Sequence, residues 1–238
     1  MFTIPEKYKC LSGSTLKTIA LISMLIDHTA LVLLYWGILY PNLPLTEGTS
    51  IYNIYLIYDV MRKIGRLAFP IFCFLLVEGF IHTSNRRNYA FRLSLFAILS
   101  EIPFDLAANN QLISPVSCNV FVTLLLGLLT IWAMDQFQNR YELQLPIVLI
   151  GCLVAYLVNS DYDFRGIILI VLLYMFRYQR DMQVISGSIA LYWEWQAIFA
   201  FIPICMYNGT RGKSMKYFFY IFYPAHLVVL CLLKQLLF

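Results

Sequence analysis

The chain has 238 residues, a length that suits one or two soluble domains, but its composition excludes a soluble protein. Apolar residues make up 61% and charged residues only 13%, against roughly a quarter in an average soluble chain. The mean hydropathy is +0.72. A soluble surface of this size needs far more charge, so the sequence predicts a multi-pass membrane protein.

The net charge of +4 is too small to indicate binding to nucleic acid. The cations lie in short clusters between apolar runs, a pattern that sets membrane topology. The six cysteines are scattered without a C-x-x-C pair or a nearby histidine, so we expect neither a metal site nor a disulfide framework. The first apolar run is long enough to span and lacks a cleavage site, so we expect no cleavable signal peptide.

Apolar runs predict the membrane crossings, because about 20 apolar residues span a bilayer. The uninterrupted runs, in chain order, are 18–40, 64–81, 89–107, 120–134, 145–158, 166–176 and 217–237. A further stretch, 184–207, is interrupted by the triplet Trp193-Glu194-Trp195. We predict one domain over residues 1–238, an all-α polytopic bundle with eight or nine transmembrane crossings and a short broken hairpin near 184–207.

The distribution of charge predicts a cytoplasmic N-terminus, because Lys7, Lys9 and Lys17 precede the first crossing. Alternation then places these basic positions inside: Arg86, Arg87, Arg140, Arg177 and Arg180. Residues 41–58 and 106–118 carry no Lys or Arg and fall outside. The run Arg211, Lys213, Lys216 is cytoplasmic only if 184–207 turns back on itself, giving nine crossings. We favour this hairpin over a single crossing, and its short halves favour a re-entrant segment.

Ionisable side chains at membrane depth are costly and are functional candidates by default. The positions concerned are Asp27, His28, Arg66, Glu78, Arg92, Glu101, Asp105, Glu194 and His226. Four-residue spacing places Glu101 and Asp105 on one helix face, near the carbonyl that Pro103 leaves free. Adjacent helical residues point about 100° apart, so Asp27 cannot readily orient the His28 ring. If His28 is a base, its carboxylate partner comes from another helix, with Glu101, Asp105 and Glu78 as candidates.

Other interpretations of the same residues stay open. Arg62 and Arg66 share a helix face and can simply pair with Asp59 or with a carboxylate on a neighbouring span. His226 can serve only as a hydrogen-bonding residue between helices. A proton-coupled transporter of a small solute also uses intramembrane acids and histidines as relays. A non-catalytic assembly protein of a pilus or secretion system is a third possibility.

The order of short motifs resembles the TraX family, the pilin-acetylation proteins of conjugative plasmids and their chromosomal relatives. The motifs run over nearly the whole chain in family order: 16–20, Met24-Leu25-Ile26-Asp27-His28, 64–72, 76–80, 92–93, Ser100-Glu101-Ile102-Pro103-Phe104-Asp105, 119–124, Asp161-Tyr162, 207–212 and 219–227. Lys17, ten intervening residues and His28 are also similar to the basic-ten-His signature of the membrane acyltransferase-three family. Lysine here replaces the arginine that is common in that signature.

These resemblances imply a multi-pass protein of the bacterial cytoplasmic membrane that transfers an acetyl or other short acyl group from acyl-CoA, without a metal. The acceptor is an amine or hydroxyl of a peptide, protein or envelope component; a pilin N-terminus is the family precedent. His28 would be the general base, directly or through an acyl-histidine. Asp27, Glu101 and Asp105 would orient it or balance charge, and Arg66 would hold a carboxylate or the thioester oxygen.

A helix from Lys17 to His28 rises roughly 16 Å, about half the hydrocarbon thickness, so Lys17 would lie at the cytoplasmic face and His28 near the midplane. The expected contacts of the CoA phosphates are Lys17, Arg86, Arg87, Arg177, Arg180, Arg211 and Lys213. Gly209 and Gly212 would let the backbone approach a phosphate. The further polar residues expected to have a substrate-binding or structural role are Glu78, Asn119, Asp161 and His226.

Overall fold

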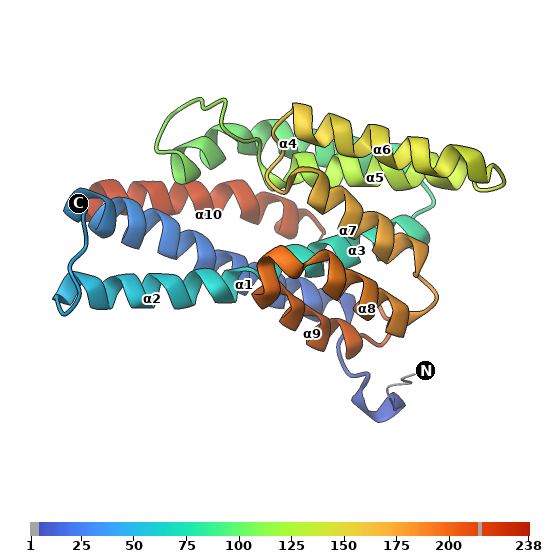
Figure 1. Cartoon of the computed structure of the whole chain (residues 1–238), viewed down its shortest axis with the longest axis horizontal. Coiled ribbons are helices and arrows are strands. Elements are labelled where there is room, and N and C mark those ends of the chain that lie inside the picture. The colour runs from blue at the N-terminus through green and yellow to red at the C-terminus, as the bar shows by residue number, and fades with distance from the viewer. Residues whose placement is uncertain (1–4, 214–215) are drawn as a thin grey trace.

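The computed structural model describes residues 5–213 and 216–238 as a bundle of helices that run mostly along its long axis (Figure 1). Among the described residues there is no strand; two isolated bridges join Leu11 to Tyr207 and Cys118 to Ser160. The all-α prediction is confirmed. The helices, in chain order, are η1 (Glu6–Tyr8), α1 (Gly13–Thr29), η2 (Ala30–Leu39), η3 (Tyr40–Asn42), α2 (Ser50–Gly65), α3 (Ala68–His82), α4 (Arg86–Ala108), α5 (Val120–Gln136), α6 (Tyr141–Leu157), α7 (Asp163–Met175), α8 (Arg180–Ala190), η4 (Tyr192–Ala200), α9 (Phe201–Cys205) and α10 (Lys216–Leu237).

Within residues 5–213 and 216–238, three helical stretches are long and apolar enough to cross a membrane: Gly13–Asn42, Ser50–His82 and Tyr217–Leu237. The outer faces of the bundle are apolar too. Helix α6, for example, exposes Leu145, Leu149 and Leu153 on one face. A row of exposed leucines would be unfavourable in water and is favourable against lipid. The chain is therefore a helical membrane protein.

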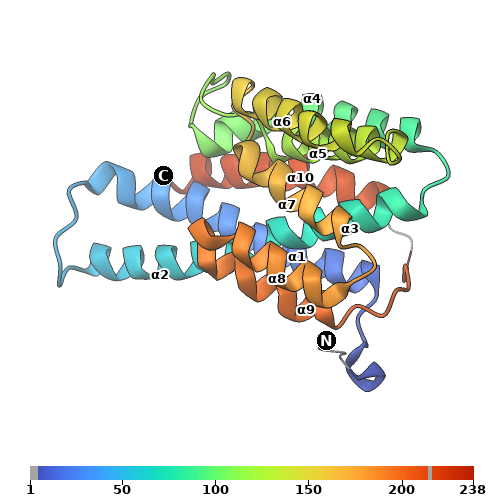
Figure 2. The ribbon, with the colours of Figure 1, turned by 45° about the vertical axis from the view of Figure 1, so that its right-hand side comes forward.

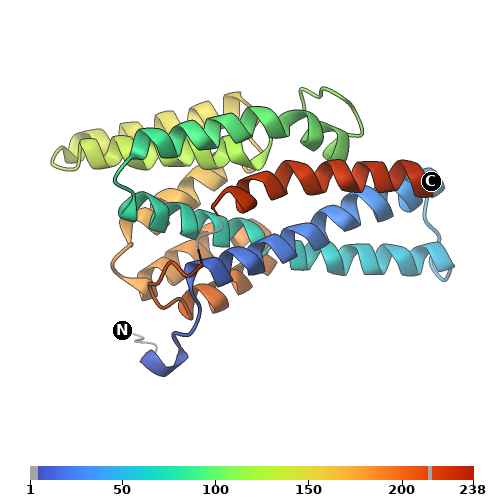
Figure 3. The same ribbon diagram turned by 180° about the vertical axis from the view of Figure 1, so that it is seen from behind.

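The bundle has two chemically different ends, which Figures 2 and 3 show from two further sides. One end, called the basic end below, contains the start of α1 and the turns 83–85, 137–140, 176–179 and 206–213. It gathers Arg86, Arg140, Arg177 and Arg211. The opposite end, called the far end, contains the loops 43–49 and 109–119 and the C-terminus. The predicted grouping of the basic turns on one side is confirmed.

The segment that follows α9 packs against the first turn of α1. The Ser12 hydroxyl accepts a hydrogen bond from the backbone N–H of Thr15 at 3.3 Å, and the N–H groups of Gly13 and Ser14 donate to the carbonyls of Thr210 and Arg211. Gly212 has a φ of +69°, and a Cβ there would overlap the hydroxyls of Ser12 and Ser14. This glycine is therefore needed for the close contact with α1, while the expected phosphate approach stays a prediction.

Helix α2 corrects the predicted outer loop. Residues 41–58 were expected to lie outside the membrane, but the chain is helical from Ser50, capped by the Thr49 hydroxyl, which accepts from the N–H of Tyr52 at 3.2 Å. The predicted span 64–81 is only the second half of a longer path, because α2 and α3 follow one another with a break at Gly65–Leu67. Several polar residues in α2 lowered its apparent hydropathy and hid it.

The predicted broken hairpin near 184–207 is present. Helix α8 rises from the basic end, Glu194 leaves helical geometry with φ −141° and ψ 60°, and α9 returns. The return is fixed by the Leu11 N–H, which donates to the Met206 carbonyl at 2.9 Å. Eleven residues of helix in α8 rise only about 16 Å, roughly half the hydrocarbon thickness. The hairpin therefore ends in the middle of the bundle, where its tip helps to form the site.

Candidate active site

A cavity of about 270 Å³ lies in the middle of the bundle, where several helices begin, end or break. Its polar lining consists of Asp27, His28, Arg62, Arg66, Ser117, Asp161, Tyr162 and Tyr223. A smaller cavity of about 110 Å³ shares Arg66, Asp161 and Tyr162 with the first and adds Trp193 and Glu194 from the hairpin tip. Non-helical backbone at this depth is tolerated only inside protein or beside a polar cavity, so these breaks mark the site.

The break between α2 and α3 is held against α1. The Ser23 hydroxyl donates to the Ile64 carbonyl at 2.5 Å, which satisfies a backbone group that the break releases. Gly65 lets the two segments touch, because a Cβ at this position would occupy the space of the Asp27 carboxylate. The break thereby places Arg62 and Arg66 beside the cavity.

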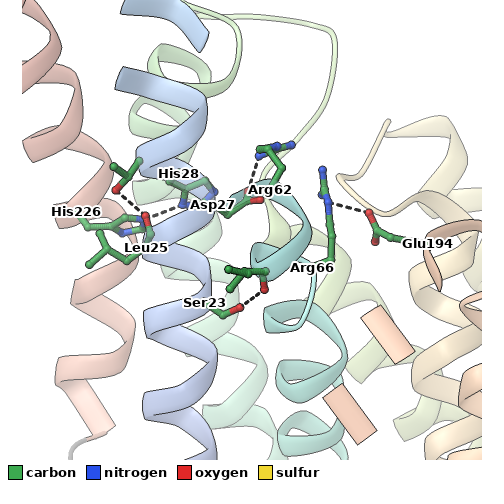
Figure 4. A network of polar contacts seen from close by, with 10 residues as sticks. Ser23, Leu25, Asp27, His28, Arg62, Arg66, Glu194 and His226 are labelled. Atoms are coloured by element: carbon green, nitrogen blue, oxygen red, sulfur yellow. Dashed lines mark hydrogen bonds and ion pairs between the residues drawn. The ribbon is translucent and has the colours of Figure 1, made fainter. Parts of the chain in front are cut away.

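Two ion pairs lie at these cavities: Asp27 and Arg62 line the larger one, and Glu194 lines the smaller one, which shares Arg66 with the larger (Figure 4). Arg62 Nη1 lies 2.5 Å from Asp27 Oδ2, and Arg66 Nε lies 2.9 Å from Glu194 Oε1. The second pair joins the α2–α3 break to the hairpin tip. The other oxygen of each carboxylate, Asp27 Oδ1 and Glu194 Oε2, is buried without a hydrogen-bond partner among the described residues. Arg62 and Arg66 thus both pair with carboxylates on other helices, which was one of the open interpretations of these residues.

His28 is paired with a second histidine. Its Nδ1 lies 2.7 Å from Nε2 of His226 on α10, and Nδ1 of His226 lies 2.8 Å from the backbone carbonyl oxygen of Phe222. The two imidazoles are stacked with centroids 5.0 Å apart. The predicted carboxylate partner for His28 from Glu101, Asp105 or Glu78 is therefore wrong.

The two acids of α4 face the loop between α4 and α5. Glu101 accepts from both the backbone N–H and the side-chain amide of Asn119, and that amide also donates to the Ala97 carbonyl at 2.7 Å. Asp105 accepts from the N–H of Ser114 at 2.8 Å. The shared face of the two acids was predicted correctly, but helical spacing does not fix how a helix is rotated toward its neighbours.

We therefore expect Glu101→Gln to act on stability more than on His28. The glutamine keeps an acceptor for Asn119 but loses the charge that strengthens the two hydrogen bonds. The thermal midpoint of the purified protein should fall, while any activity that depends on His28 should change less than about tenfold. Thermal unfolding and activity measured on the same preparations check this, and an activity loss without a change in midpoint would contradict it.

Two further predicted residues lie far from His28. His82 is exposed at the basic end, with Nδ1 2.9 Å from the backbone carbonyl oxygen of Glu78. The Glu78 side chain is close to Arg180 and Tyr207, also at the basic end. Asp161, by contrast, does line the cavity, in the turn before α7.

Sequence reasoning missed a role for Glu194, Arg62 and Tyr162. Tyr162 stacks on Phe69 with ring centroids 3.5 Å apart. The signals were present for the two charged residues: Glu194 is an ionisable residue at membrane depth inside an interrupted apolar run, and Arg62 is four residues from Arg66. No pattern in the sequence indicated that Tyr162 would meet them.

The basic residues expected to bind CoA phosphates form two groups. Lys17 lies over the Phe219 ring at 5.3 Å and close to Arg211, next to the exposed Lys213. On the other side of the basic end, Arg86 Nη1 is 2.6 Å from Asp135, which also accepts from the Tyr174 hydroxyl. Arg177 lies over the Tyr174 ring at 4.2 Å, Arg180 lies over the Phe74 ring at 4.4 Å, and Arg87 is exposed.

Comparison with known proteins identifies the family. The family model described as TraX protein matches residues 12–234. The chain belongs to the TraX family. The family prediction is thereby confirmed, and the cavity residues Asp27, His28, Arg66 and Asp161 all lie in the motifs that carried it.

A curated relative is the probable fimbrial assembly protein FimC, serogroup H1, of Dichelobacter nodosus. It is 29% identical over 256 aligned positions, which cover 95% of this chain and 97% of the relative. The similarity thus extends over both proteins almost end to end. No solved structure gives a significant match.

Proposed function

We propose that this TraX-family protein is a membrane acyltransferase that moves an acetyl or other short acyl group from acyl-CoA to an amine or hydroxyl. One observation carries the proposal: the imidazole of His28 lines a cavity at mid-bundle, beside two guanidinium groups and held by a second imidazole. A passive anchor gains nothing from so many polar groups at this depth, since each costs folding free energy.

The chemistry requires a base and a site for developing negative charge. The acceptor nitrogen or oxygen attacks the thioester carbonyl, and His28 removes the acceptor proton. The carbon–sulfur bond then breaks and CoA leaves as the thiol, taking that proton from His28. Arg66 uses Nε for Glu194, so its terminal N–H groups are suited to the oxyanion that forms on the thioester oxygen. Asp27 and Arg62 balance charge beside the base.

For acyl-CoA we favour binding from the basic end. Lys17, Arg211 and Lys213 form a cationic group at the start of α1, and Arg87 adds an exposed cation. The helix from Lys17 to His28 rises about 16 Å, a distance that the flexible arm of CoA must cover. Met24, Phe69 and Phe72 line the cavity on this side, so the arm must displace apolar side chains between α1 and α3.

The comparisons and the charge distribution support an acceptor class and a location for the protein. The Dichelobacter relative is described as a probable fimbrial assembly protein, which supports a subunit of a surface fibre, or another envelope component, as acceptor. Positive residues remain on the cytoplasmic side, so the basic end and the N-terminus face the cytoplasm across the inner membrane. We favour nine crossings, two of them the short halves of the hairpin.

The decisive experiment uses the purified protein in lipid nanodiscs with radiolabelled acetyl-CoA and membranes from a strain lacking the gene. Label should pass to a polypeptide or envelope fraction, and a sample with His28→Ala should leave the acceptor unlabelled. Solute uptake into proteoliposomes driven by a proton gradient, without label transfer, would instead support a transporter. Fibre assembly that needs the protein but survives in His28→Ala would support a non-catalytic assembly role.

The proposed orientation makes a labelling prediction at Thr210, an exposed residue of the basic end. With the native exposed Cys10 replaced by serine, Thr210→Cys should react in intact spheroplasts only with a maleimide that crosses membranes. A matched variant at the far end, Gln111→Cys, should react with an impermeant maleimide. The reverse pattern would place the basic end outside and remove Arg211 from contact with cytoplasmic acyl-CoA.

A further inference from the structure

A chain of two hydrogen bonds runs from a backbone carbonyl to the candidate base. The carbonyl oxygen of Phe222 lies 2.8 Å from Nδ1 of His226, and Nε2 of His226 lies 2.7 Å from Nδ1 of His28. His226 is 6% exposed and lies on α10, which brings it to α1 from 198 residues away in the sequence. Both distances are those of ordinary hydrogen bonds, so each contact needs exactly one proton.

The carbonyl fixes where these protons are. A carbonyl oxygen can only accept, so the Nδ1 of His226 must carry hydrogen. In a neutral His226 the Nε2 is then the acceptor, and Nδ1 of His28 is the donor. The opposite assignment would require a doubly protonated His226, whose charge is costly in the bundle interior. The Asp27 carboxylate, which could offset such a charge, is engaged by Arg62.

We propose that His226 is a positioning residue for the base: it holds His28 in the tautomer with hydrogen on Nδ1 and leaves the lone pair of Nε2 for the acceptor proton. The proposal rests on the acyl transfer proposed above. The ring that makes the bond is itself held, because His226 stacks on Phe222 with centroids 5.0 Å apart. With hydrogen on Nε2 instead, that nitrogen has no lone pair for the acceptor proton, so the tautomer decides activity.

The groups around the two imidazoles favour sharing the acceptor proton between His28 and His226, without a carboxylic acid as an intermediate. Tyr223 meets both imidazoles edge-on, at 6.0 Å from His28 and 5.8 Å from His226. Asp27, Arg62 and Arg66, which line the cavity with His28, are all in ion pairs. When His28 takes the acceptor proton, the positive charge is therefore shared first with the neutral ring of His226.

The tautomers are read directly by NMR of the ring nitrogens in protein grown with isotope-labelled histidine. The chain has three histidines, and His82→Gln removes the one at the basic end, leaving two signals to assign. Expected are a protonated Nδ1 and an unprotonated Nε2 on both remaining rings. A protonated Nε2 on His28 in this sample overturns the proposal. This measurement needs no acyl transfer, so it decides whether His226 fixes the tautomer of His28 even if the proposed function fails.

Activity tests the consequence. His226→Leu removes the acceptor, and kcat for acyl transfer should fall by at least about 10²-fold with little change in KM for acetyl-CoA. His226→Gln retains a side-chain oxygen that accepts from Nδ1 of His28, and should keep kcat within about tenfold of the wild type. Equal loss in both variants together with a lower thermal midpoint would mean a packing role and overturn the proposal. Wild-type kcat in His226→Leu would overturn it too.

Discussion

Replacing His28 with alanine should lower acyl transfer by at least about 10²-fold, the usual share of a general base. The protein should still insert and purify, because the cavity that His28 lines keeps its walls of apolar residues from α3 and α4. Transfer of labelled acetyl from acetyl-CoA, measured per mole of monodisperse protein, checks the prediction.

His82→Ala is the matched control for this experiment. His82 is a histidine at the end of a membrane-embedded helix, but it lies exposed at the basic end. The control should keep wild-type turnover. Equal turnover in His28→Ala and the wild type would remove His28 from the mechanism, whereas equal loss in both histidine variants would indicate that the change acts through insertion.

Gly65→Ala should inactivate the protein through the ion pair of α1. The added methyl group would occupy the space of the Asp27 carboxylate, so Asp27 must move and Arg62 loses its partner. Leaving one partner of a largely buried pair uncompensated typically costs about 3–5 kcal/mol. We expect a lower thermal midpoint and a loss of acyl transfer, both measured in nanodiscs.

Gly79→Ala tests whether any alanine in this region has the same effect. A Cβ at Gly79 would meet chiefly the ring tip of Tyr89, which can shift by a few tenths of an ångström. A further variant separates the effect of shape from that of charge. Asp27→Asn keeps the side-chain volume and removes the charge, so it should lose acyl transfer as Gly65→Ala does. A wild-type midpoint and activity in Gly65→Ala would show that the contact between α1 and the break is not needed.

The wrong partner for His28 shows where sequence reasoning stops. Four-residue spacing correctly placed Glu101 and Asp105 on one face, and adjacency correctly separated Asp27 from the His28 ring. Which helix lies opposite His28 depends on how helices pack and rotate, and α10 fills that position with His226. Nothing local in either segment encodes a contact between residues 198 positions apart.

The helix breaks show a similar division. The hairpin was predictable because the triplet Trp193-Glu194-Trp195 interrupts an apolar run. The basic run that follows lies on the cytoplasmic side only if residues 184–207 cross the membrane an even number of times. Helix α2 was not found, because Asn53, Asp59 and Lys63 lower its hydropathy. Their helix is stabilised by contacts with α1 and η2 and by the Asp59–Lys63 pair.

The sequence by itself determined the membrane class, the basic end, the family and the identity of the central histidine, since these depend on composition, local order and charge. The tertiary structure alone decided that Arg62 and Glu194 lie at two neighbouring cavities that share Arg66 and Asp161, and that His226 holds His28. The reason is physical: a charged residue at membrane depth must pair with an opposite charge, and the chain contains several acids and bases that could serve equally well as its partner. Only the packing of the helices, set by small residues such as Gly65, selects which pairs are close enough to form.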